Sequence, residues 1–155
     1  MKRFLLIFTL VCNLLNTSVY ALELSPDIDL TNQKATLERM ESNIDQLLDR
    51  AINISMQVNS TDPGEYTEQA KKLKDQVKFY ESQIVDLRNN LNKWHQQTEN
   101  YSDKSKIFSL ILTTDAYLAT IDNLTAFLDS KGSNDKLRAA IEYKYIGDAN
   151  FNKYK

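Results

Sequence analysis

Apolar side chains recur along the chain at alternating steps of three and four residues, the spacing of one face of an α-helix. The most regular stripe lies between residues 66 and 101. Its members are Tyr66, Ala70, Leu73, Val77, Tyr80, Ile84, Leu87, Leu91, Trp94 and Tyr101, with Thr98 as the one polar position. Five heptads in a single phase predict a long helix that ends at about Tyr101.

A similar stripe precedes this helix. Its members are Leu37, Met40, Ile44, Leu47, Ala51, Ile54 and Val58. The pattern predicts a helix from about Asp27 to Val58, with Asp27 or Asp29 as the residue that caps its start.

The segment Ser-Thr-Asp-Pro-Gly at 60–64 separates the two stripes. Because proline fixes its own backbone and glycine accepts positive φ, this segment predicts a chain reversal. The two helices are therefore predicted to form an antiparallel, coiled-coil-like hairpin, in which the stripe from Val77 to Trp94 faces the first helix. A second copy of the chain, joined through the same heptad stripe as a homo-oligomer, is the alternative partner.

The heptad phase breaks between residues 102 and 106. We interpret this break as the start of a third helix, capped by Ser102 or Asp103, that runs to Asp129. Its apolar arc is wider than one seam requires, so we expect other helices to cover it on more than one side. A second apolar row on the first helix offers a place for it. That row consists of Leu48, Ile52 and Met56.

Asn134 is predicted to cap a short fourth helix that ends at Tyr145, and the residues from Gly147 onward are predicted to be loose. No strand-like alternation is found after residue 21. The predicted fold class is therefore all-α, an antiparallel helical hairpin with a third packed helix and a short C-terminal helix.

The first 21 residues have the pattern of a secretory signal peptide: Lys2 and Arg3, an apolar run from Phe4, and small residues before a cleavage point after Ala21. We therefore expect a secreted protein, extracellular or periplasmic, with no stable membrane span after cleavage. The mature chain is predicted to contain a three-helix bundle over residues 22–130, followed by a short helix and an aromatic-basic tail over 131–155.

The composition of the chain excludes several kinds of active site, metal site and partner. Cys12, the single cysteine, lies in the predicted signal peptide, so the mature chain has neither a thiol nucleophile nor a disulfide. The mature chain has 17 basic and 21 acidic side chains, a net charge of −4, which argues against nucleic acid as a partner. His95 is the single histidine, and the three glycines stand apart, so the common zinc sites and phosphate loops are excluded. We expect no cofactor, no metal and no enzymatic activity.

These exclusions favour a protein that acts by binding an unknown protein or cell-surface partner. The candidate contact residues are Phe79 and Val85, which lie off the main stripe, together with the aromatic side chains of the tail. The latter are Tyr143, Tyr145, Phe151 and Tyr154. One alternative is an extracytoplasmic chaperone or carrier for apolar clients. A second alternative is an enzyme built on His95.

Overall fold

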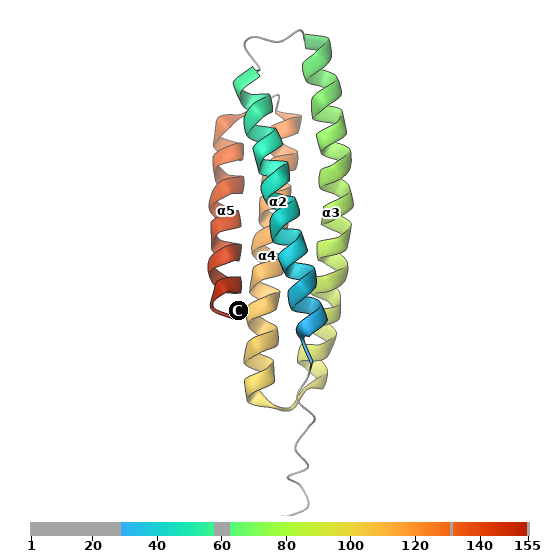
Figure 1. The fold of residues 1–155 in the computed structure, drawn as a ribbon, viewed down its shortest axis with the longest axis vertical. Helices are drawn as coiled ribbons and strands as arrows, with labels where there is room; N and C mark the ends of the chain where they lie inside the picture. The colour runs from blue at the N-terminus through green and yellow to red at the C-terminus, as the bar shows by residue number, and fades with distance from the viewer. Residues whose placement is uncertain (1–28, 58–62, 131, 155) are drawn as a thin grey trace, which may run out of the picture.

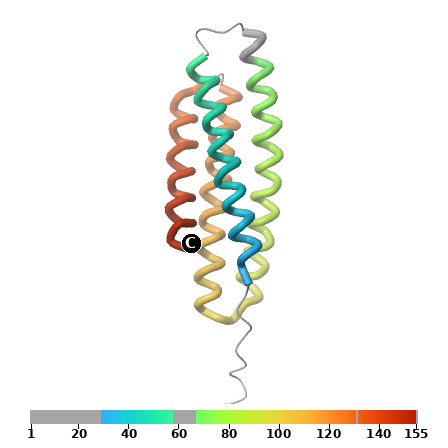
Figure 2. The backbone as a smooth tube through the Cα atoms, viewed as in Figure 1, coloured from blue at the N-terminus to red at the C-terminus, as the bar shows by residue number. Residues whose placement is uncertain are grey.

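The computed structural model describes residues 29–57, 63–130 and 132–154, and in this part of the chain it forms an all-α helical bundle, which confirms the predicted fold class. Successive helices run in alternating directions (Figures 1 and 2). Their bounds are α2 Thr31–Gln57, α3 Pro63–Gln97, α4 Tyr101–Asp129 and α5 Asn134–Asn152.

The four helices are not equivalent in their packing. Among the described helices, every pair is in contact except α3 and α5, which lie on either side of α2 and α4 (Figure 1). The closest association is between α4 and α5, followed by that between α3 and α4. Helix α4 therefore has neighbours over most of its circumference, as the wide apolar arc in its sequence predicts.

The heptad stripe of α3 is buried within the same chain. Val77, Ile84 and Leu91 are fully buried, while Tyr80 and Trp94 are half-buried at its margins. The predicted contact with the first helix is present but is the smaller part, because α3 packs more extensively against α4 than against α2. The stripe from Val77 to Trp94 is thus shared between two neighbouring helices.

The junction between α3 and α4 differs from the prediction. Helix α3 ends at Gln97, not at Tyr101, and the cap of α4 is Asn100, not Ser102 or Asp103. The Asn100 side-chain oxygen accepts hydrogen bonds from the backbone N–H groups of Ser102 and Asp103. These bonds satisfy donors that have no partner within a helix, so the turn is stable at this point despite the continuing apolar pattern.

The C-terminal prediction was wrong in its length. The fourth helix, α5, continues through Gly147 to Asn152, and Phe151 in the predicted loose tail is fully buried. Gly147 faces α4, where a Cβ atom would come within 2.5 Å of Tyr117 Cε1. Close packing of α5 on α4 therefore outweighs the low helix propensity of glycine.

The second apolar row of α2 also has a different partner from the one predicted. Leu48 is buried and Ile52 is half-buried in a groove whose opposite wall is formed by Ile141 and Tyr145 of α5, whereas Met56 is exposed. Helix α5, not α4, therefore lies beside Leu48 and Ile52 in this groove.

Several predictions fall on residues outside the described ranges. They are the signal peptide over residues 1–21, the alternative cap Asp27, the end of the first helix at Val58 and the turn residues 60–62. The other candidate cap, Asp29, is described, and its Oδ1 accepts a hydrogen bond of 2.9 Å from the backbone N–H of Thr31. Hydrogen bonding from the Thr31 side chain, together with this backbone bond, lowers the pKa of the Asp29 carboxyl.

Candidate binding surface

One arc of α4 faces away from the other described helices, and its ring contact between Phe108 and His95 of α3 lies at its margin. Its α3-facing side carries Asp115 and Asp129, which form ion pairs with Arg88 and Lys74 of α3. Its α5-facing side carries Ala116, next to Gly147. Between these two sides, residues spaced by seven, four, seven and seven form one row, which we call the α4 outer stripe. It consists of Tyr101, Phe108, Leu112, Ala119 and Ala126.

The α4 outer stripe contains large apolar side chains that solvent reaches. Tyr101 is 86% exposed, Phe108 50% and Leu112 40%. Ala119 and Ala126 are half-buried. None of the five residues is charged, although outward-facing arcs of helices in bundles are normally polar.

Neighbouring helices extend this apolar surface. The pairs Arg88–Asp115 and His95–Phe108 fix how α3 lies along α4, and the helical repeat then places Val85 on the same side as the stripe. Gly147 fixes α5 in the same way and places Tyr143 and Ile146 on the other margin. Nine large apolar residues are exposed in the described part of the chain. The helical repeat places six of them on this side of the bundle.

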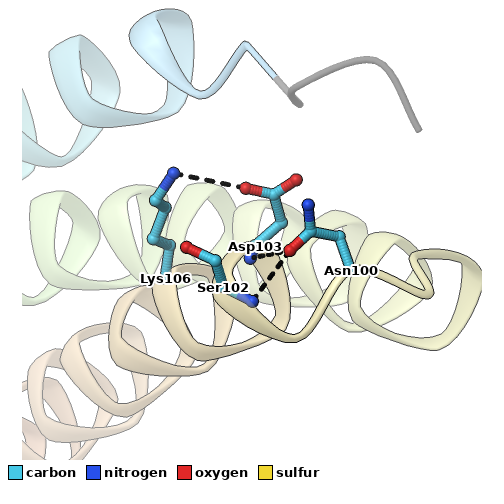
Figure 3. Close-up of polar contacts among 4 residues, drawn as sticks. All are labelled: Asn100, Ser102, Asp103 and Lys106. Carbon is cyan, nitrogen blue, oxygen red and sulfur yellow. Dashed lines mark hydrogen bonds and ion pairs between the residues drawn. The ribbon is translucent and has the colours of Figure 1, made fainter. Parts of the chain in front are cut away.

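Polar contacts fix the N-terminal end of α4, where Tyr101 lies (Figure 3). Besides the Asn100 cap, the Asp103 carboxylate accepts a hydrogen bond of 3.3 Å from Lys106 Nζ. Asp103 is only 1% exposed, and its second oxygen has no hydrogen-bond partner among the described residues. A carboxylate in the first turn is favoured by the helix dipole, which offsets part of the cost of its burial.

A second polar cluster joins α2, α4 and α5. The Tyr117 hydroxyl donates a hydrogen bond of 3.0 Å to Asp148, and Lys144 Nζ bridges Asp148 at 2.7 Å and Asp45 at 2.5 Å. Burial, together with the charge of Asp148, raises the pKa of Tyr117 well above its usual value of 10.0. Burial alone would lower the pKa of Lys144, but its bonds to the two aspartates outweigh it and raise that pKa.

The predicted contact residues divide into three groups. Val85, at 37% exposure, and Tyr143, at 41%, border the α4 outer stripe. Phe79 is exposed but lies on the far side of α3, with its ring edge-on to Tyr80. The structure therefore brings together only two of the candidates named from the sequence.

The remaining candidates belong to the C-terminal part of α5 and the residues that follow it. Phe151 is a core residue, so its side chain presents no surface to a partner. The Tyr154 ring is half-buried beneath Lys34 Nζ, which lies 5.0 Å from its centroid, and burial raises the pKa of its hydroxyl. Tyr145 is exposed at the edge of the groove between α2 and α5, a shallow space of about 270 Å³.

Sequence reasoning missed four residues of this surface: Tyr101, Phe108, Leu112 and Ile146. A signal for two of them was present. The heptad phase that ends at Tyr101, continued onward, places Phe108 and Leu112 on one row, and both are surplus to the buried stripe of the third helix. A helix with more apolar positions than its neighbours can cover must expose some of them.

Within residues 29–57, 63–130 and 132–154, no three acidic, histidine or cysteine side chains are grouped so that they could hold a metal ion. None of the described helices has the length and apolarity needed to cross a bilayer. His95 is half-buried with its ring 6.0 Å from that of Phe108, at the edge of the apolar surface.

No protein-family model, curated protein or solved structure matches this chain. What the molecule does must therefore be inferred from its own surface.

Proposed function

We propose that this protein is exported and acts without catalysis, by binding another protein through the open face of α4. The observation that carries the proposal is the gathering of six exposed large apolar side chains on one side of the bundle. Large apolar side chains exposed together on one side of a bundle are costly to leave in water and typically mark a site of contact with another molecule.

The scaffold beneath this face suits a binding role. Ion pairs from α3, the Asn100 cap and the tight α5 contact each restrain α4. A surface that is already ordered loses less conformational entropy on association, so more of the contact free energy appears as affinity. An apolar face between packed helices fits a protein partner better than a small ligand, which requires a concave pocket.

Export is proposed from the N-terminal sequence. The protein purified from its own source should begin at Leu22, which N-terminal sequencing or intact mass would test. A chain that still begins at Met1 would contradict cleavage.

Site-specific crosslinking tests the binding role. A photo-crosslinking phenylalanine analogue replaces Leu112 in the full sequence, and irradiation is carried out in the source cells. The matched control carries the same analogue in place of Asp86, an exposed residue of α3 distant from the apolar face. We expect a discrete protein adduct at position 112 and not at position 86. Equal labelling at the two positions, or none at either, would overturn the proposal.

A further inference from the structure

The side chains of the α4 outer stripe are large in one half of the helix and small in the other. Tyr101, Phe108 and Leu112 occupy the N-terminal half of the helix, and Ala119 and Ala126 the C-terminal half. The two halves are also in register. Tyr101 and Ala126 are equally distant from the point midway between residues 113 and 114, and so are Phe108 and Ala119.

This arrangement is self-complementary. If a second copy lies antiparallel across the first, with the two-fold axis at that midpoint, Tyr101 and Phe108 each meet an alanine, and Leu112, next to the axis, meets Leu112 of the other copy. Phe108 of each copy then lies over Ala119 of the other, and Tyr101 over Ala126. A two-fold interface requires this kind of reciprocity, because the same patch must serve as both partners.

Charge supports the same register. Lys104 and Asp122 lie in the row that carries Asp115 and Asp129, on the α3 side of the stripe. An antiparallel two-fold pairing brings these sides of the two copies together. Lys104 and Asp122 are nearly equidistant from the midpoint, with a mismatch of one residue, or about 1.5 Å. Neither forms an ion pair within the described part of the chain.

The face is large enough to form a specific dimer interface. From Tyr101 to Ala126 the stripe is about 37 Å long at 1.5 Å per residue. One helix spacing of about 9 Å on either side adds the margins formed by α3 and α5. The length of the stripe multiplied by the total width gives an area of roughly 700 Å² per copy. This area is close to the roughly 800 Å² that each partner buries in a specific interface.

We propose that the α4 outer stripe is the interface of a two-fold symmetric, antiparallel dimer of this chain, with Lys104 of each copy paired to Asp122 of the other. This inference rests on the proposed function, since it assigns a second copy as the protein bound by the same face.

Sedimentation velocity over a range of concentrations tests the dimer. The protein is expressed from the full sequence and purified in the form that the expressing cells produce. We expect a monomer–dimer equilibrium for the wild type. Phe108→Asp should weaken the dimer by at least tenfold, because it places a charge against Ala119 of the other copy. The matched control, Phe79→Asp, changes another exposed phenylalanine, which lies outside the face, and should have no effect.

Charge reversal tests the register. Lys104→Glu alone and Asp122→Lys alone each place like charges together twice in the dimer and should weaken it by about tenfold. The variant with both changes restores opposite charges and should recover most of the affinity. Circular dichroism should show the same helix content in all variants. A wild type that stays monomeric, or a double variant no tighter than the single ones, would overturn the proposed dimer.

The crosslink at position 112 separates the two proposals. An adduct with twice the mass of the chain supports the dimer. An adduct with a different protein overturns the dimer while leaving the proposed function intact. No adduct above the control overturns both.

Discussion

The contact between Gly147 and Tyr117 provides the most direct test of the packing described above. A methyl group at position 147 would lie 2.5 Å from Cε1 and 2.6 Å from Cδ1 of the Tyr117 ring. Carbon atoms at rest are about 3.5–4.0 Å apart, so one of the two helices must shift. Tyr117 is fully buried and its hydroxyl is bonded to Asp148, so its ring has little room to yield.

Two effects of opposite sign decide the outcome of Gly147→Ala. Replacing glycine by alanine inside a helix is favourable by about 1 kcal/mol. Overpacking a filled core typically costs about 1–3 kcal/mol, and moving the ring also weakens a hydrogen bond worth roughly 1 kcal/mol. We therefore expect a net loss of about 1–3 kcal/mol in the free energy of unfolding.

Urea denaturation followed by circular dichroism would measure this loss. Ala149→Gly, at an exposed position of α5, is the matched control and reports the propensity difference alone. Adding Tyr117→Leu to Gly147→Ala should make the alanine substitution less costly than it is opposite tyrosine. If Gly147→Ala is as stable as the wild type or more stable, α5 does not approach α4 as closely as described.

Three further outcomes follow from the polar contacts and the core. Asn100→Ala should cost about 1 kcal/mol in the free energy of unfolding by urea titration, because α4 loses its cap, whereas Asn89→Ala, on the exposed surface of α3, should cost nothing. Phe151→Ala should cost about 3–5 kcal/mol and Tyr145→Ala under 1 kcal/mol in the same assay; equal losses would contradict the helical, buried C-terminus. Tyr117 has a raised pKa in the folded state, so its stabilisation is complete below pH 10 and declines above it. Tyr117→Phe should therefore flatten the fall in stability above pH 10 by up to about 1.4 kcal/mol per pH unit, and an unchanged slope would contradict burial of the hydroxyl.

The sequence allowed the helices to be located more reliably than their ends. The buried positions of α2 and α3 are those of the apolar stripes, because a helix must bury one face and the spacing of three and four residues identifies that face. The ends were harder to predict because caps compete locally. Asn100, Ser102 and Asp103 are all good capping residues, and backbone geometry selects Asn100.

The candidate surface was predictable only in part. The exposure of Val85 agrees with its position off the stripe of α3. The glycine at position 147 predicts a break and a loose tail that includes Phe151. In the structure, the same glycine is the residue that lets α5 pack against Tyr117. A glycine in a helical pattern can mark either a break in the helix or a close contact with a neighbouring helix. Only the residue that it faces shows which of the two applies.

The spacing of apolar residues and the cost of exposing them to water are enough to predict that the described part of the chain is helical and which faces are apolar. The tertiary structure selects which helices cover which faces. That choice depends on contacts between residues distant in the sequence, such as Arg88 with Asp115 and Gly147 with Tyr117. It leaves the outer arc of α4 uncovered by the described helices, and this uncovered arc is where we place the function of the protein.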